Sequence, residues 1–352
     1  MIRRSRTARS AAASIAALAL VLTACADPDS EGPSEKEQRV AEGKTLPTVE
    51  EVPEIAETLP ADIREAGKLV MATNAPYPPL EFFDTDNKTL IGYDIDLGDA
   101  IGDVLGVDVE WKNISFDGII PGLQADKYDA GMAGFSIESE RLPAVDFVSY
   151  YLSGGGFLIK KGSGIEVSSF EDMCGLRVAV QKGVSQVEAL QHASEHCEET
   201  GEEPIKISQI PDQNVVVLNL QSDRADVAVG DKPQVEYAAG HSDGELCVIS
   251  TYQTQHSIAG IAVPKGNDEL TAALQAAINE LIESGDYAQI SEFWGTGIAV
   301  DGATLSEEYE ELSAPWGVGP DGTVQESLVF TDPSEIEPGH TYYYQPINPG
   351  CA

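Results

Sequence analysis

From about residue 60 to about residue 295, segments in which every second residue is apolar alternate with segments in which apolar residues recur every three or four positions. Val107–Asn113 (VDVEWKN) alternates apolar with polar residues, which predicts a half-buried strand. Asp268–Ser284 (DELTAALQAAINELIES) repeats apolar residues at three- and four-residue spacing, which predicts a helix with one buried face. Because segments of the two kinds follow one another in turn, the pattern predicts an α/β protein.

The other predicted elements follow from the same patterns. At 352 residues the chain has room for two domains of the usual size, roughly 100–200 residues each. The further elements are a short helix over Pro60–Gly67, a strand over Lys68–Thr73, a helix over Gly92–Gly106, a helix, turn and strand over Phe116–Gly134, a second α/β run from near Gly155, a strand over Ile258–Gly266 and a last helix over Asp286–Gly295.

The first 25 residues have the features of an export signal. Arginines among residues 1–9 precede an apolar stretch, Ser10–Ala24, that is shorter than the about 20 residues of a membrane span. The stretch ends in Leu22–Cys25 (LTAC), which resembles the lipobox of bacterial lipoproteins, where the chain is cut before an acylated cysteine. We therefore expect residues 1–24 to be a lipoprotein signal peptide and Cys25 to carry a lipid. An ordinary signal peptide with a cysteine near its end is the alternative.

Residues 25–59 differ in composition from the α/β block that follows them. They are acidic, contain several prolines and have few aromatic residues. Such a segment cannot bury enough apolar surface to fold alone, so we predict a disordered acidic tether.

The charge of the chain excludes one class of partner. Its 59 Asp and Glu against 21 Lys and Arg give a formal net charge of −38. No basic surface is available to neutralise phosphates, so nucleic acid is not expected as a partner. The cysteines form no CxxC pair, so no metal site is expected.

Seven motifs occur in a fixed order inside the α/β block, and together they identify a family. They are GKLVMATNAPYPPLEF, GYDIDL, FDGIIPGLQADKYDA, GFSIESERLPAVDF, VQKGVSQ, ADVAVGD and GIAVPKGNDEL. Each is weak alone, but in this order and spacing the chain resembles the extracellular solute-binding proteins of polar amino-acid ABC importers, family 3. The resemblance covers about Pro60–Gly295.

The resemblance implies a periplasmic-binding-protein fold of type II, in which two mixed-sheet lobes are joined by a two-strand hinge and the ligand binds in the cleft. Lobe I would comprise residues 60–152 together with residues 257–300, and lobe II residues 153–256. Residues 301–352 fall outside the family pattern, as a C-terminal extension of unknown role.

With Cys25 lipidated, four cysteines remain, and export favours disulfides with three pairings open. Relatives often bridge at the positions of Cys174 and Cys197, which flank the glycine-loop strand and its helix. Cys247 with Cys351 then follows by elimination.

A free α-amino acid presents a carboxylate and an ammonium group, and burying either one unpaired is costly. The resemblance implies that Arg141 clamps the ligand carboxylate by two parallel hydrogen bonds, with Ser136 beside it. Ser185 is implied as a second carboxylate contact, at a helix start whose free N–H groups attract anions. As alternatives, Arg141 could pair with Glu138 or Glu140 at the surface, and Ser185 could be a simple helix cap.

Asp231 ends the strand ADVAVGD and matches the acidic residue that holds the ligand ammonium group in the family, with Gly134 adding backbone contacts. Tyr77 and Phe116 match positions where relatives hold the ligand between aromatic rings, although both could instead be core residues.

Asn74 and Gln181 should also meet the side chain of the ligand. Relatives that take basic amino acids often carry an acid where this chain has Asn74, so this departure favours a neutral polar ligand.

Taken together, these implications predict a lipid-anchored receptor on the extracellular face of the cell membrane. It would bind a free amino acid and deliver it to an ABC permease, as a monomer, without a cofactor and without enzymatic activity. The alternatives are an enzyme on the same scaffold, such as a dehydratase, and a ligand-sensing lipoprotein that feeds no transporter.

Overall fold

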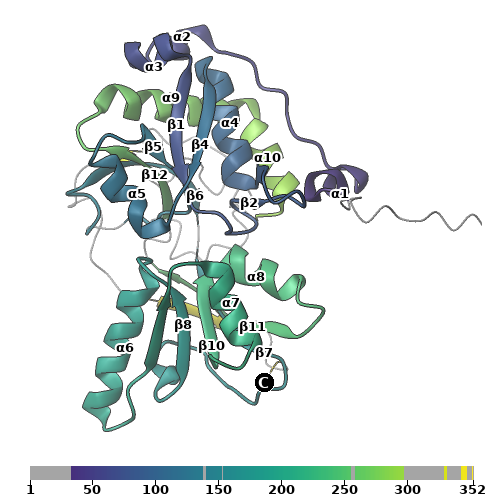
Figure 1. Cartoon of the computed structure of the whole chain (residues 1–352), viewed down its shortest axis with the longest axis vertical. Helices are drawn as coiled ribbons and strands as arrows, with labels where there is room; N and C mark the ends of the chain where they lie inside the picture. The colour runs from purple at the N-terminus through teal and green to yellow at the C-terminus, as the bar shows by residue number, and fades with distance from the viewer. Residues whose placement is uncertain are drawn as a thin grey trace, which may run out of the picture. The chain divides into compact units, whose positions relative to one another are not determined.

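The computed structural model describes residues 33–137, 140–152, 154–254, 258–296, 329–330, 342–346 and 351. Its two large sheets each have six strands of mixed direction and are covered by helices (Figure 1). Lobe I is the part built on the first sheet, and lobe II is the part built on the second. The alternation of strands and helices confirms the predicted α/β class.

The sheet of lobe I has the strand order β13-β6-β12-β5-β1-β4, in which β1 pairs in parallel with β4 and β5, and the other neighbours pair antiparallel. Its strands are β1 (Lys68–Thr73), β4 (Asp108–Asn113), β5 (Ala130–Gly131), β6 (Val145–Leu152), β12 (Ile258–Pro264) and β13 (Val329–Phe330). Its helices are α3 (Ala61–Ala66), α4 (Tyr93–Leu105), α5 (Phe116–Leu123), α9 (Asp268–Ser284) and α10 (Asp286–Trp294), with a hairpin of β2 (Phe82–Phe83) and β3 (Leu90–Ile91). The apolar face predicted for α9 packs into the core of lobe I, where four of its side chains are fully buried: Leu270, Leu274, Ile278 and Leu281.

The sheet of lobe II has the strand order β14-β11-β7-β10-β8-β9. Its strands are β7 (Gly155–Lys160), β8 (Arg177–Gln181), β9 (Lys206–Ile210), β10 (Val227–Asp231), β11 (Leu246–Thr254) and β14 (Tyr342–Pro346). Its helices are α6 (Gln186–Thr200), α7 (Gln213–Gln221), α8 (Lys232–Gly240) and the short 3-10 helix η1 (Glu171–Met173). β8 and β10 are parallel neighbours, so their carboxyl ends, at Gln181 and Asp231, lie at the same edge of the sheet.

Up to the end of α10 the chain passes between the lobes twice, from β6 to β7 and from β11 to β12. In lobe I β6 pairs with β12, and in lobe II β7 pairs with β11. The two crossings are therefore neighbours, an arrangement that suits a hinge between two rigid bodies.

The prediction of a disordered tether over residues 25–59 is wrong for residues 33–59. This segment forms α1 (Glu35–Ala41), which begins with a capping box, and α2 (Pro53–Ala56). The segment is ordered without a core of its own because it packs on the core of lobe I. Lobe I therefore begins well before residue 60. Its apolar side chains that pack there are Leu46, Val49, Val52 and Ile55. Residues 1–32, with the predicted signal peptide and Cys25, lie outside the described residues.

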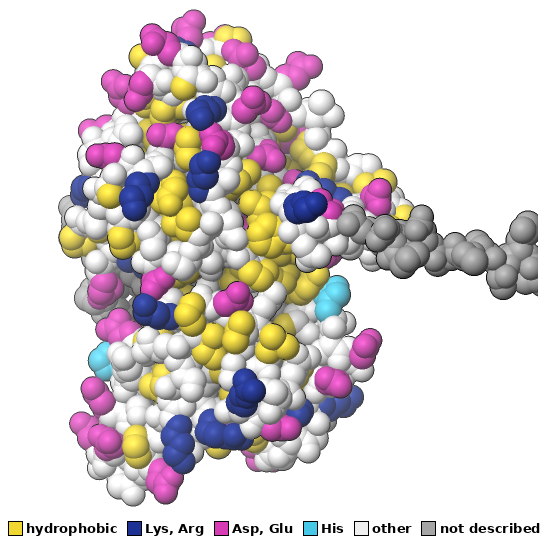
Figure 2. Space-filling view, viewed as in Figure 1, with side chains coloured by type: hydrophobic (Ala, Val, Ile, Leu, Met, Phe, Trp, Pro, Cys, Tyr) yellow, Lys and Arg dark blue, Asp and Glu magenta, His cyan; other side chains and the backbone are white. Residues whose placement is uncertain are grey.

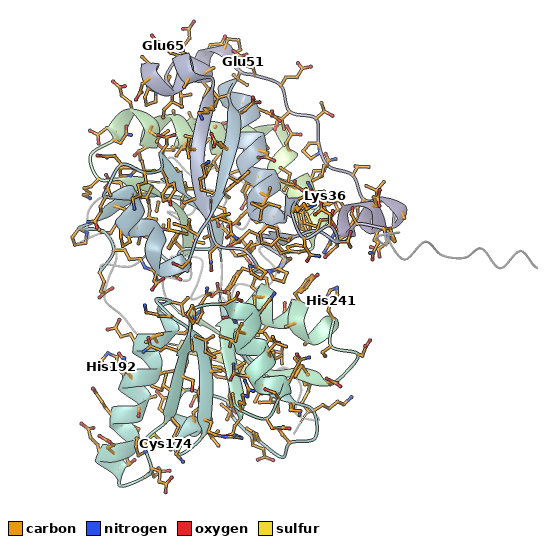
Figure 3. All side chains as sticks on the ribbon, in the orientation of Figure 1. Lys36, Glu51, Glu65, Cys174, His192 and His241 are labelled. Carbon is orange, nitrogen blue, oxygen red and sulfur yellow. A yellow bond between two sulfur atoms is a disulfide. The ribbon has the colours of Figure 1, made fainter. Side chains whose placement is uncertain are left out.

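The C-terminal extension adds one strand to each sheet. β13 pairs with β6 in lobe I, and β14 pairs with β11 in lobe II. Cys351 forms a disulfide with Cys247, which ties the end of the chain to lobe II. The second disulfide joins Cys174 to Cys197, at the end of lobe II away from lobe I (Figure 3). The structure thus has both expected cysteine pairs.

Acidic side chains are spread over both lobes on the face in Figure 2, without one dominant patch. Within the described ranges, no helix has the length and apolar character needed to cross a membrane.

Candidate functional site

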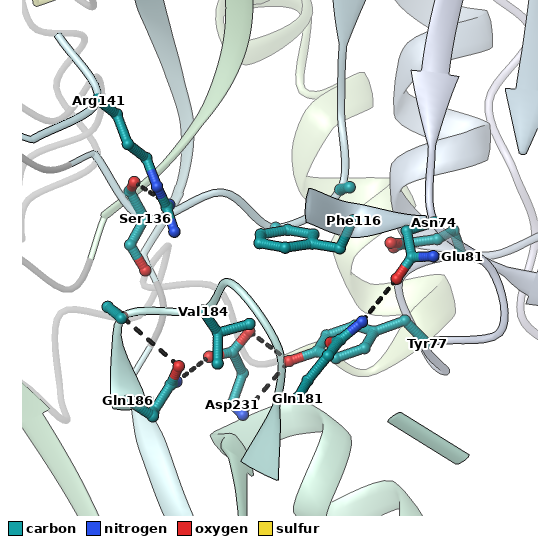
Figure 4. Close-up of a pocket in the computed structure, with 13 residues that line it drawn as sticks. Asn74, Tyr77, Glu81, Phe116, Ser136, Arg141, Gln181, Val184, Gln186 and Asp231 are labelled. Atoms are coloured by element: carbon teal, nitrogen blue, oxygen red, sulfur yellow. Dashed lines mark hydrogen bonds between the residues drawn. The ribbon is translucent and has the colours of Figure 1, made fainter. Parts of the chain in front are cut away.

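A narrow cavity with a free volume of about 10 Å³ lies between the two lobes (Figure 4). This is about the space that one water molecule needs, so the lobes are closed on one another and a ligand could enter only if they part. Every residue predicted to contact the ligand lines it: Asn74, Tyr77, Phe116, Gly134, Ser136, Arg141, Gln181, Ser185 and Asp231. Four residues that were not predicted as contacts line it too: Glu81, Ala133, Val184 and Gln186.

Arg141 lies on the lobe I side of the cavity, in the segment between β5 and β6. Its Nη1 donates to the carbonyl oxygen of Ser136 at 2.7 Å and its Nη2 to that of Gly183, in lobe II, at 3.1 Å. Its guanidinium carbon is 5.7 Å from the centre of the Phe116 ring, within cation–π range. The guanidinium therefore faces the cavity between the lobes.

Asp231 closes β10 at the lobe II side and is buried. Its Oδ2 accepts a hydrogen bond from the Tyr77 hydroxyl of lobe I at 2.6 Å. Its Oδ1 accepts one from Gln186 Nε2 at 2.8 Å. Gln186, which the sequence analysis did not single out, is the first residue of α6 and orients the carboxylate.

Gly134 has a left-handed backbone with φ 61°, and a Cβ there would come within 3.1 Å of Leu80 Cδ1. Its N–H donates to Asp94 Oδ2 at 3.2 Å, and the Tyr150 hydroxyl donates to the same oxygen at 2.7 Å. Burial raises the pKa of Asp94 to about 7, although these two hydrogen bonds stabilise the carboxylate and act to lower it. Asp94 thus fixes the backbone at Gly134 from behind the cavity.

The other end of the cavity is built from Asn74, Gln181, Tyr77 and Phe116. Gln181 Nε2 of lobe II donates to Asn74 Oδ1 of lobe I at 2.7 Å. The Phe116 ring stacks on Phe135, with centroids 4.5 Å apart. Phe116 and Tyr77 are both buried, and both line the cavity, so they serve the core and the site together.

Glu81 is the acidic wall residue that the sequence analysis missed. It is 1% exposed, and its Oε2 has no hydrogen-bond partner. Burial, with the nearby carboxylates of Asp94 and Asp231, raises the pKa of Glu81 well above its usual value. The only signal in the sequence was that Glu81 lies between apolar residues in PPLEF, which would have predicted that it is buried but not that it lines a cavity.

Ser185 precedes α6, but its side chain does not cap that helix. Its hydroxyl lies at the cavity wall, 3.5 Å from Gln186 Oε1. The preceding Gly183 has φ 85°, and a Cβ there would lie 3.2 Å from Asp117 Cβ of lobe I. Glycine at this position therefore allows the two lobes to approach closely.

The arrangement pairs opposite charges across one cavity. Arg141 and Ser136 lie on one side of the Phe116 ring, and Asn74 and Glu81 on the other, with Asp231 facing them from lobe II (Figure 4). Such a site can hold a small molecule with one anionic group and one or more cationic groups. It would do so by replacing hydrogen bonds that now join the lobes directly.

Known proteins are similar to this chain in sequence and in fold. The arginine-binding protein ArgT of Corynebacterium glutamicum is 33% identical over 245 residues, which cover 69% of this chain and 79% of that protein. A solved ancestral arginine-binding protein bound to arginine has a TM-score of 0.59 at 35% identity, covering 65% of this chain and 98% of that one. The ancestral amino acid-binding protein AncCDT-1, a precursor of cyclohexadienyl dehydratase, has a TM-score of 0.60 at 32% identity, covering 66% and 97%.

These structural neighbours are two-lobed amino-acid-binding proteins, which confirms the predicted fold class. Residues 69–297 match the profile of one family over most of both lobes. The chain therefore belongs to the bacterial extracellular solute-binding proteins, family 3.

Proposed function

We propose that this protein is an exported receptor that binds a free α-amino acid in the interlobe cavity and delivers it to an ABC permease. The observation that carries the proposal is that Arg141 of lobe I and Asp231 of lobe II line the same cavity. A zwitterion satisfies both charges only when the lobes are together, so its binding would bias the hinge toward closure.

The ligand carboxylate would take the place of the two carbonyl oxygens that Arg141 now contacts. A guanidinium can hold both carboxylate oxygens through parallel N–H bonds, which a lysine cannot. The hydroxyls of Ser136 and Ser185 would complete this end. The N–H groups at the start of α6 add a partial positive charge beside it.

The ligand ammonium group would bind Asp231, displacing the Tyr77 hydroxyl from Oδ2. Gln186 would keep the carboxylate oriented through Oδ1, and the backbone of Gly134 would add a contact. An ammonium group has three donors, so a carboxylate and a backbone carbonyl together satisfy most of them.

The number of acidic groups in the cavity wall favours a ligand with a cationic side chain. An α-amino acid pairs its carboxylate with Arg141 and its ammonium with Asp231, which leaves Glu81 as an extra buried acid without a partner for Oε2. A guanidinium or ammonium side chain lying past Tyr77 and Phe116 would supply that partner. The expectation of a neutral ligand rested on Asn74, and Glu81 shifts it toward an arginine-like ligand, the kind that the relative ArgT binds by its name.

Delivery would follow from closure, because a permease can recognise the closed form of both lobes together. A lipid on Cys25 would hold the receptor at the extracellular face of the membrane, where a monomer suffices. Mass spectrometry of the mature protein from cells tests the anchor, since Cys25→Ser should abolish the lipid and release the protein.

The binding proposal is tested by calorimetric titration with L-arginine after a thermal-shift screen of the twenty amino acids. Arg141→Ala should weaken binding by about 2–5 kcal/mol, about 30- to 4,000-fold, because it removes one partner of a buried charge pair. Arg224→Ala, on the exposed surface of lobe II, is the matched control and should change nothing. Equal affinity of wild type and Arg141→Ala would contradict the proposed site.

A dehydratase-like enzyme is the second candidate, because Glu81 has the raised pKa that a general acid requires. The neighbour AncCDT-1 belongs to such a lineage by its name. Against it, Asp231 across the cavity from Arg141 suits an intact amino acid that is held and released. Incubation with candidate ligands, followed by chromatography for a product, separates the two functions.

A further inference from the structure

We propose that α1 is an interlobe latch: it is fixed to lobe I and holds lobe II through a hydrogen bond between Glu35 and Tyr237, which favours the closed cavity. The helix lies ahead of residues 69–297, the part that matches the family. The latch therefore includes a helix outside the part of the chain that matches the family.

The helix is fixed to lobe I by two cations. Arg39 Nη1 donates to the carbonyl oxygen of Phe293 in α10 at 2.9 Å, and its guanidinium carbon lies 4.7 Å from the centre of the Trp294 ring. Lys36 pairs with the buried Asp96 of α4, which also accepts a hydrogen bond from Trp294 Nε1 at 2.9 Å. Because these contacts reach both α4 and α10, α1 is held as part of lobe I (Figure 3).

From this position α1 reaches lobe II. Arg39 Nη2 holds Glu35 Oε1 at 2.5 Å, and Glu35 Oε2 accepts a hydrogen bond from the Tyr237 hydroxyl of α8 at 2.7 Å. The side chains of Glu35 and Arg39 are only 19% and 14% exposed. A charge-assisted hydrogen bond shielded from water in this way is stronger than a surface contact.

Aromatic rings add a second contact between the lobes next to this hydrogen bond. The Phe82 ring of lobe I lies 5.9 Å from the Tyr237 ring and 5.7 Å from the Trp294 ring. Hydrophobic side chains gather beside α1 on the face shown in Figure 2. Opening of the hinge would separate Tyr237 from Phe82 and Glu35 at the same time.

The latch and the ligand act on the same element of lobe II. Asp231 is the N-cap residue of α8, and Tyr237 lies further along that helix. A movement that takes Asp231 away from Tyr77 also takes Tyr237 away from Glu35. Both contacts therefore stabilise one closed state, and each strengthens the other by linkage. The effect on affinity rests on the proposed amino-acid binding, whereas the effect on the distance between the lobes does not.

The test uses the mature full-length protein, with spin labels on Asp62→Cys in lobe I and Glu202→Cys in lobe II, both exposed. Without added amino acid, Tyr237→Phe and Glu35→Ala should each move part of the interlobe distance distribution to longer distances. Glu42→Ala, at the exposed end of the same segment, and Tyr128→Phe in lobe I are the controls and should leave it unchanged.

With L-arginine as the probe, each latch variant should raise Kd about 2- to 10-fold, mainly through faster dissociation. The double variant should raise Kd no more than the single variant with the larger effect, because both substitutions remove the same hydrogen bond. An unchanged distance distribution in both variants overturns the latch. A shifted distribution supports it even if L-arginine does not bind, and in that case only the proposed ligand fails.

Discussion

Replacement of Glu81 by Gln is the sharpest test of ligand charge, because it removes the one carboxyl group that could ionise beside a cationic ligand side chain at this end of the cavity, and it hardly changes shape. Glu81 is 1% exposed and its Oε2 has no partner, so a cationic side chain of the ligand would complete it. We expect Glu81→Gln to weaken L-arginine binding strongly and to leave or improve binding of neutral L-glutamine.

The magnitude follows from burial. At a surface, such a pair contributes about 0–1 kcal/mol because water and salt screen it. In the closed cavity the screening is small, and loss of one partner of a buried charge pair costs about 2–5 kcal/mol. The expected loss of affinity for L-arginine is therefore about 30- to 4,000-fold.

The pH dependence gives a second measurement with a definite sign. Burial and the neighbouring carboxylates raise the pKa of Glu81 in the free protein, whereas a bound cation would lower it again. Binding should therefore release a proton, and affinity for L-arginine should increase as pH rises toward the raised pKa. Calorimetry in two buffers of different ionisation enthalpy measures that proton.

Asp231→Asn is the reference variant for this experiment, since it should weaken L-arginine and L-glutamine alike by removing the ammonium partner. If Glu81→Gln instead binds both amino acids as the wild type does and releases the same number of protons, the reasoning about the cationic side chain is refuted.

Three predictions concern stability. Because the pKa of Asp94 is raised to about 7, the free energy of unfolding should fall as pH rises from about 4 to about 7. Urea titrations should show that Asp94→Asn lacks up to about 4 kcal/mol of this fall. If the pH profiles of wild type and variant are parallel, burial does not raise the pKa of Asp94. Replacement of Cys174 and Cys197 by Ala should lower stability to urea by about 3 kcal/mol, the loop-closure value for a separation of 23 residues, and no loss would mean that the bond is not formed. A chain that starts at residue 57 instead of 33 should lose about 3–6 kcal/mol, because it lacks four half-buried apolar side chains, whereas an unchanged melting temperature would show that the segment does not pack.

Much of the fold could be predicted from local patterns. The predicted strand over Lys68–Thr73 and the predicted helix over Asp268–Ser284 coincide with β1 and α9, because hydrophobic period and turn residues act over a few neighbouring positions. The motifs also named residues that come together around one cavity, from Asn74 to Asp231. A family motif can predict which residues line the cavity, because each motif occupies a fixed position in the fold, at the carboxyl edge of a sheet or at the start of a helix.

Local patterns and motifs therefore predict the order of elements, the family and most of the cavity wall. Only the tertiary structure decided that residues 33–59 pack on lobe I and that Glu81, unlike the many surface acids, is buried against the site. It also decided that Glu35 meets Tyr237. The physical reason is common to all three: burial and ion pairing depend on neighbours that are distant along the chain, and no local period records them.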